Sequence, residues 1–145
     1  MLPKSINRSG KNKIIKNLKQ FGIDNLPYIL TKKHNEVFAF SGSLNEKKLK
    51  KLEPLNIRQI GAKILSREGS KYRLTLDSLT ILKPTKKIIE ISDKKAKRWL
   101  EGKEINIGKD IQGFVILKNK GELIGCGKVT NQKVTNFIPK GRRIN

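Results

Sequence analysis

The sequence contains a single cysteine, Cys126, among its 145 residues. One cysteine excludes an intramolecular disulfide and a zinc site built from several cysteines, and it fits the reducing cytoplasm, where we expect the protein to reside. Apolar runs are short, so no segment is long enough to cross a bilayer. The first basic residues are not followed by an apolar block, so the sequence predicts no secretory signal.

Acidic residues are also scarce. The chain has 33 Lys and Arg against 12 Asp and Glu, a net charge of +21. The excess is spread over the chain, with 18 cations and 6 anions in residues 1–85 and 15 and 6 in residues 86–145. Such an excess destabilises a compact state unless an anion offsets it, and nucleic acid is the densest common polyanion. The alternative is a set of solvated lysine faces. Glutamate is too rare for extended ion-pair networks.

Signals for catalysis are absent from the sequence. There is neither a glycine-rich dinucleotide-binding loop nor a P-loop. Cys126 lies between two glycines in an apolar segment, where we expect a buried and inert thiol. The only histidine, His34, is expected in an exposed turn, and no carboxylates occur at catalytic spacing. We therefore expect no catalytic residue, cofactor or metal.

The first part of the chain predicts a small mixed α/β domain. Residues 1–13 are polar and basic and lack a periodic pattern, and we expect them to fray. The helix predicted over 14–21 has apolar residues at helical spacing and stops at Gly22. A turn at His34-Asn35 joins two short strands. The remaining elements predicted in this part are strands 28–31, 36–41, 57–66 and 71–76 and helices 44–52 and 77–82.

The second part of the chain predicts a barrel with one helix. Lys83-Pro84-Thr85 is the best linker candidate, and it divides the chain into domains 1–85 and 86–145. A strand over 87–91 precedes a helix capped by Ser92-Asp93 that runs to about Gly102. A strand pair and a terminal strand follow, and glycines in the pair mark a bulge or a close approach of another backbone. The fold class is α+β, with a β-barrel following the N-terminal domain.

Residues 87–144 resemble the PUA domain, a compact RNA-binding barrel. The resemblance rests on the short strand, on helix 94–101 followed by Gly102, and on the strand pair that begins at Gly113. In particular, Gly125-x-Gly127-Lys128 followed by Asn136-Phe-Ile-Pro-Lys-Gly-x-Arg143 is similar to the RNA-binding tail of bacterial and archaeal rRNA cytosine-5 methyltransferases. Residues 72–79 leading into 87–91 are similar to the pre-PUA to PUA join of small ribosome-biogenesis factors. The whole chain resembles free-standing archaeal proteins of this two-unit type.

The candidate RNA-binding residues gather toward the C-terminus. Five cations lie near the predicted terminal strand and its preceding loop, where phosphate contact is their simplest role, and two more extend the patch from the helix end. Asn136 reads a base edge or holds a turn, and Gly141 either lets RNA come close or bulges the strand. Trp99 has the spacing of a core residue, whereas Phe137 is ambiguous between core and base stacking. The seven candidate cations are Lys128, Lys133, Lys140, Arg142, Arg143, Arg98 and Lys103.

These features favour a non-catalytic protein that grips structured rRNA or tRNA through a basic C-terminal surface. The resemblance implies a role in ribosome biogenesis or rRNA modification. An alternative is a protein adaptor that docks a ribosome-assembly factor or an RNA methyltransferase. A third hypothesis is an enzyme with an unfamiliar site. We expect RNA as the main partner and no membrane partner.

Overall fold

The structure is a computed structural model that describes residues 4–40, 61–109 and 111–144. The chain divides into two compact units, Met1–Pro84 (unit 1) and Thr85–Asn145 (unit 2). Each unit contains a five-stranded sheet with short helices, so the predicted α+β class is confirmed. The assignment of two domains to residues 1–85 and 86–145 stays a prediction.

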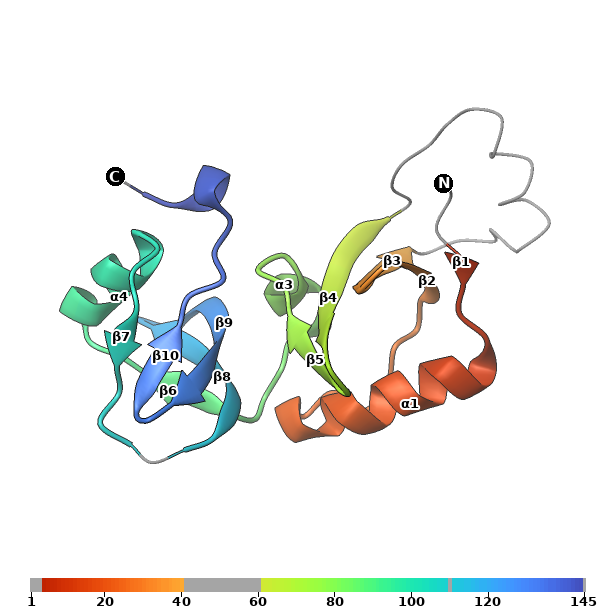
Figure 1. Cartoon of the computed structure of the whole chain (residues 1–145), viewed down its shortest axis with the longest axis horizontal. Coiled ribbons are helices and arrows are strands. Elements are labelled where there is room, and N and C mark those ends of the chain that lie inside the picture. Colours follow the sequence, from red (N-terminus) through yellow and green to blue (C-terminus); the bar gives the residue numbers. More distant parts are fainter. Residues whose placement is uncertain (1–3, 41–60, 110, 145) are drawn as a thin grey trace. The chain divides into compact units, whose positions relative to one another are not determined.

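Unit 1 is an antiparallel sheet whose strands follow the order of the chain (Figure 1). His34 has a φ of 55° in the first hairpin turn and is exposed there, as predicted. Two helical segments, α1 with its short extension η1, precede the hairpin, and α3 follows the last strand. The elements of unit 1 are β1 (Lys4–Ser5), α1 (Arg8–Leu18), η1 (Lys19–Phe21), β2 (Ile29–Lys33), β3 (Glu36–Phe40), β4 (Ala62–Glu68), β5 (Lys71–Leu74) and α3 (Ser78–Leu82).

Helix α1 is attached to the sheet of unit 1 through its apolar side. Ile14, Leu18 and Phe21 are at most 2% exposed, at the spacing that the sequence predicts. The Oδ1 atom of Asn17 accepts a hydrogen bond of 3.3 Å from the backbone N–H of Tyr72 in β5. Gly22, with a φ of 77°, ends the helical segment, because a left-handed residue at this position costs glycine little.

The sequence predicted a fraying segment over residues 1–13 and a helix from Ile14, but regular structure begins earlier in the described part of the chain. Lys4 and Ser5 form β1 and pair with β2, and α1 starts at Arg8. The side chain of Asn7 caps the helix by accepting a hydrogen bond from the Gly10 N–H at 2.8 Å. The first turns of α1 are polar because they face solvent, so apolar periodicity did not reveal them. The predicted helix 44–52 and the start of strand 57–66 lie outside the described residues.

Unit 2 is a mixed sheet with the strand order β6-β8-β9-β10-β7. Strand β6 runs parallel to β8, and the other neighbours are antiparallel. Helix α4 connects β6 to β7, so the two edge strands are joined by the single covering helix (Figure 1). The elements are β6 (Ile88–Glu90), α4 (Asp93–Leu100), β7 (Ile105–Asn106), β8 (Gly113–Asn119), β9 (Glu122–Thr130), β10 (Lys133–Thr135) and η3 (Lys140–Arg142).

Trp99 is the centre of the core of unit 2. Its side chain is 0% exposed, and its indole Nε1–H donates to the carbonyl of Ile124 at 3.1 Å. A Cβ atom at Gly125 or Gly127 would overlap the Trp99 ring. Gly125 therefore leaves room for a side chain from α4. At Gly127 a Cβ would also overlap the backbone carbonyl of Thr135 in β10, so the predicted close approach of another backbone occurs there. The prediction that Trp99 is a core residue is confirmed.

The predicted terminal strand is not formed beyond Thr135. Strand β10 ends there, and a single 3-10 turn over Lys140–Arg142 follows. Pro139, whose ring carries no N–H group, precedes this turn with a φ of −57°, so it cannot donate to a continuing ladder. Gly141 lies within the turn and does not bulge a strand.

Candidate nucleic-acid interface

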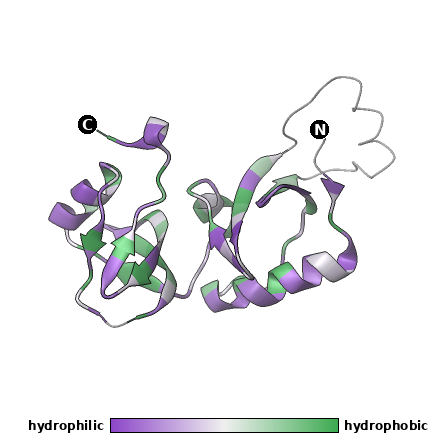
Figure 2. Ribbon diagram, in the orientation of Figure 1, coloured by the Kyte–Doolittle hydropathy of each residue, from purple (hydrophilic) through white to green (hydrophobic). Residues whose placement is uncertain are grey.

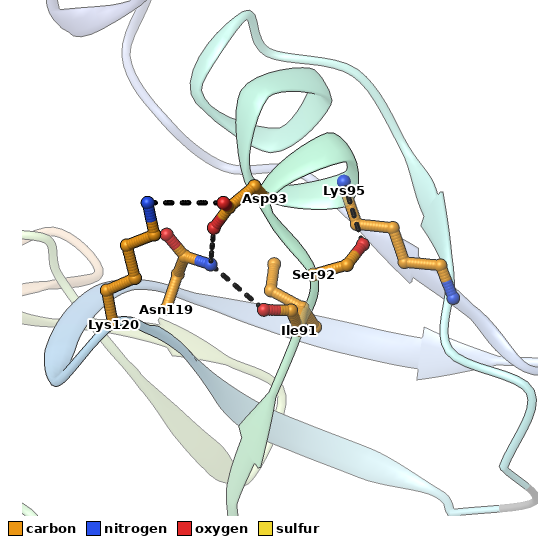
Figure 3. A network of polar contacts seen from close by, with 6 residues as sticks. All are labelled: Ile91, Ser92, Asp93, Lys95, Asn119 and Lys120. Carbon is orange, nitrogen blue, oxygen red and sulfur yellow. Dashed lines mark hydrogen bonds and ion pairs between the residues drawn. The ribbon is translucent and has the colours of Figure 1, made fainter.

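The N-terminus of α4 is fixed to the turn between β8 and β9. The Ser92 hydroxyl caps the helix by accepting from the Lys95 N–H at 3.3 Å. Asp93 accepts from the Asn119 amide at 3.0 Å and pairs with the Lys120 ammonium at 3.2 Å (Figure 3). The hydrogen bond from Asn119, followed by that from Lys120, lowers the pKa of Asp93. Asn119 also donates to the Ile91 carbonyl at 3.0 Å, so one amide connects the helix start to the hairpin.

The C-terminus of α4 ends in a Schellman motif. Gly102 has a φ of 89°, and its N–H donates to the Trp99 carbonyl at 2.9 Å. The next residue, Lys103, donates from its N–H to the Arg98 carbonyl at 3.0 Å. This pair of bonds requires a left-handed residue at position 102, for which glycine is the usual choice. The motif turns the chain away from the helix axis and leaves the last carbonyls of α4 accessible to a second segment.

Residues 136–144, the C-terminal segment, supply donors to those carbonyls. The Asn136 amide donates to the Trp99 carbonyl at 2.7 Å and to the Lys103 carbonyl at 3.0 Å. Its Oδ1 atom accepts from the Ile138 N–H at 2.8 Å. The Ile144 N–H donates to the Leu100 carbonyl at 2.9 Å. Since both amide hydrogens of Asn136 are used within the chain, the structure favours the turn-holding interpretation of this residue.

Arg143 also contributes to this attachment. Its Nε–H donates to the Ile138 carbonyl at 2.9 Å, and a Cβ at Gly102 would overlap its side chain. The guanidinium therefore lies over the C-terminal end of α4, where the helix dipole favours a positive charge. Arg143 is half-buried, whereas Lys140, Gly141 and Arg142 of η3 are exposed.

An open groove of about 610 Å³, here called the α4 groove, runs beside the helix. Four cations line the groove. Two of them, Arg98 and Lys133, were predicted from the sequence as RNA-binding residues. Lys133 lies across from Asn106 in the β10–β7 ladder, and its ammonium is 4.0 Å from the Glu104 carboxylate. The lining residues are Ser92, Lys94, Lys95, Arg98, Glu104, Ile105, Asn106, Gly108 and Lys133.

Five of the nine predicted residues fall into two groups, and Lys140, Gly141 and Arg142 form the exposed η3 turn. Arg98 and Lys133 meet in the α4 groove, and Lys103, Asn136 and Arg143 lie at the C-terminal end of α4. In Figure 2 both α4 and η3 are largely purple, which reflects their polar residues. Neither group contains Lys128, an exposed residue of β9 that pairs with Thr135.

Lys94, Lys95 and Asn106 are among the polar residues of the α4 groove that sequence reasoning did not assign to the site. Lys94, Lys95 and Arg98 follow one another at positions i, i+1 and i+4, so helical spacing alone could have placed the two lysines beside Arg98. Asn106 had no such signal. Its Oδ1 accepts from the Gly108 N–H at 2.7 Å, which shapes the loop at the end of the groove.

Two other residues discussed in the sequence analysis, Cys126 and Phe137, are partly or fully buried. Cys126 is buried in β9, as predicted, and Phe137 is half-buried in the C-terminal segment. The described part of the chain contains no group of three or more His, Cys, Asp or Glu residues arranged to hold a metal. Its helices are all too short or too polar to span a bilayer.

Comparison with known families adds to this geometry. Residues 86–144 match the family model described as the methyltransferase RsmF PUA domain. Unit 2 has the PUA fold. The match covers the PUA unit with its α4 groove and its C-terminal segment, so the resemblance drawn from the sequence is confirmed.

Individual proteins show how far the similarity extends. The chain is 26% identical over 108 residues to the ribosomal RNA small subunit methyltransferase F of Vibrio vulnificus, in strains YJ016 and CMCP6. This covers 73% of the chain but only 22% of each relative, so the chain spans about a fifth of their length. The aligned stretch is longer than the PUA unit and therefore extends into unit 1.

A solved structure covers nearly the whole chain. A conserved PUA domain protein from Thermoplasma acidophilum aligns with a TM-score of 0.61, over 92% of this chain and 92% of that chain, at 13% sequence identity. At this identity the similarity concerns the fold. The similarity in fold therefore extends over residues of both units of this chain.

Proposed function

We propose that this protein is a non-catalytic RNA-binding protein. The observation that carries the proposal is the meeting of Lys94, Lys95, Arg98 and Lys133 in the α4 groove of a PUA unit. Among the residues that the structure describes, Glu104 is the only acidic one that lines this groove, and lysine and arginine are the side chains that neutralise phosphates. The groove would follow an RNA backbone, and the C-terminal segment would contact it beside α4.

The RNA class that we propose is structured ribosomal or transfer RNA. The matched relatives are named for methylation of ribosomal RNA of the small subunit. The part of the relatives that this chain matches is about a fifth of their length. We propose that this chain assists rRNA modification or ribosome assembly by holding RNA, while a separate enzyme carries out the chemistry.

A second proposal, that the protein is an adaptor for another protein, is supported by one observation. Ile144 is exposed to 45%, and it closes the C-terminal segment next to the exposed η3 turn. An apolar residue amid cations suits a protein partner that also contacts RNA. A complex with a methyltransferase or an assembly factor that survives nuclease treatment would favour this alternative.

RNA binding is tested by fluorescence anisotropy with a labelled hairpin from small-subunit rRNA. We expect log K to fall linearly with log salt, with a slope of about −0.7 to −0.9 for each phosphate contact. Arg98→Ala with Lys133→Ala should reduce the slope by roughly two such contacts. A matched control is Lys86→Ala with Lys118→Ala, which removes two cations of unit 2 that do not line the groove. Equal losses in both double variants would contradict the assignment of the groove.

A further inference from the structure

We infer that the exposed face of α1 in unit 1 is a second RNA-binding surface that tracks phosphates. This inference rests on the proposed function and extends it to unit 1. The surface consists of the exposed side chains of α1 and is here called the α1 face. It forms a shallow hollow of about 460 Å³ lined by Arg8, Ser9, Asn12, Lys13 and Lys16.

The first argument is the charge of the segment. No acidic residue precedes Asp24 in the sequence, whereas six lysines or arginines do. Lys11 donates to the Tyr28 carbonyl at 2.8 Å, so its ammonium serves the fold. Within the described residues, no ion pair joins an acidic side chain to α1, although Lys63 and Arg73 of the same unit pair with Glu36 and Glu68.

The second argument is that the cations on the exposed face of α1 do not stabilise the fold. Arg8 occupies the first helical position, where the positive end of the helix dipole disfavours a cation. Lys13 and Lys16 are three residues apart, a spacing at which like charges repel on a helix. The buried side of α1 is already complete without these groups, because Ile14 and Leu18 pack on the sheet. An external anion would relieve the repulsion.

The third argument concerns the chemistry of the lining. Arg8 and Lys16 are two helical turns apart with Asn12 between them, and all three are exposed. Cations alternating with neutral hydrogen-bond donors suit a row of phosphate oxygens, which accept from both kinds of group. The described residues of the lining include no aromatic side chain and no carboxylate, so the α1 face is suited to grip a backbone without reading bases.

The test uses the full chain and the same labelled rRNA hairpin as above, with a longer form of the hairpin as a second probe. The variant is Arg8→Ala, Lys13→Ala and Lys16→Ala. Alanine favours the helix, so circular dichroism and the thermal midpoint should show an intact fold. The charge-matched control is Lys4→Thr, Lys32→Thr and Lys71→Thr, three exposed strand positions of the same unit in which threonine is well tolerated.

We expect the α1 variant to lower the salt slope by two to three contacts and the affinity by roughly fivefold per lost contact at about 0.1 M salt. The control variant should change the salt slope and the RNA affinity much less. If the α1 variant and the control lose the same affinity, only net charge matters and the inference is overturned. If the α1 variant keeps full RNA affinity but loses binding to phosphatidylserine vesicles, the surface belongs to a membrane and the inference is also overturned.

The two proposals fail in different ways. Loss of RNA binding in the α4 groove variant with no change in the α1 variant would overturn the α1 face and leave the proposed function standing. An unaffected groove variant together with a weakened α1 variant would overturn the groove and keep RNA binding in unit 1. A wild-type chain that binds neither probe would overturn both.

Discussion

The side-chain amide of Asn136 donates to the carbonyl oxygen of Trp99 at 2.7 Å. This bond joins the C-terminal segment to the helix whose indole fills the core of unit 2. Asn136, for which the sequence left base reading and turn holding open, completes the end of α4 together with the Ile144 N–H on the Leu100 carbonyl. The position of the η3 cations therefore depends on a few hydrogen bonds at the helix terminus.

Asn136→Asp should detach the C-terminal segment. Aspartate retains an acceptor for the Ile138 N–H but cannot donate to the carbonyls of Trp99 and Lys103. We expect a loss of about 1–3 kcal/mol in the free energy of unfolding, since two hydrogen bonds are removed. Denaturant unfolding measures this loss, and amide exchange at Ile144 should accelerate. Unchanged protection of the Ile144 N–H would show that Asn136 does not hold the segment.

Gly125→Ala should destabilise unit 2, because the added methyl group would overlap the Trp99 indole. Overpacking of a core costs about 1–3 kcal/mol. Gly141→Ala is the matched control, since nothing lies within 4 Å of a Cβ at that position. The midpoints of thermal unfolding of the two variants are compared, and that of Gly125→Ala should be lower. Equal midpoints for the two proteins would mean that the indole has room that the structure does not show.

Arg143→Lys separates the charge of this residue from its hydrogen bond. Lysine keeps the positive charge but lacks the Nε–H that donates to the Ile138 carbonyl, so stability should fall by about 0.5–1.5 kcal/mol. The salt slope of RNA binding should remain near that of the wild type if the charge contacts phosphate, whereas Arg143→Ala should lower it by about one contact. The same slope in all three proteins would remove Arg143 from the RNA-binding residues.

The contact between Asp93 and the β8–β9 turn should depend on pH. The pKa of Asp93 is lowered in the folded chain, first by Asn119 and then by Lys120. Its stabilising effect is therefore present above the pKa of an unfolded aspartate and is lost as the pH falls through the folded value. Asn119→Ala should raise the pKa of Asp93 toward its usual value. A carboxyl NMR titration measures the shift, and Lys118→Ala, which leaves Asp93 untouched, serves as the control.

Parts of the fold were readable from local patterns. The helical spacing of Ile14, Leu18 and Phe21, and the Ser92 cap before α4, gave the two main helices. The start of α1 was missed because its first turns face solvent, so only the Asn7 cap marks them. The terminal strand was predicted without bounds. It extends only over Lys133–Thr135, and the segment after it is bonded to the end of α4 instead.

The sequence by itself determined the large positive charge, most helices and strands and the resemblance of the C-terminal unit to the PUA domain, because composition, periodicity and motifs are local properties. Tertiary structure decided which cations share a surface. Lys133 lines the same groove as Arg98 only because β10 pairs with β7. Arg143 lies against Gly102 at the end of α4, a residue that is distant from it in the sequence. Contacts between distant residues depend on how helices and strands pack, and packing is not encoded in the spacing of any one segment.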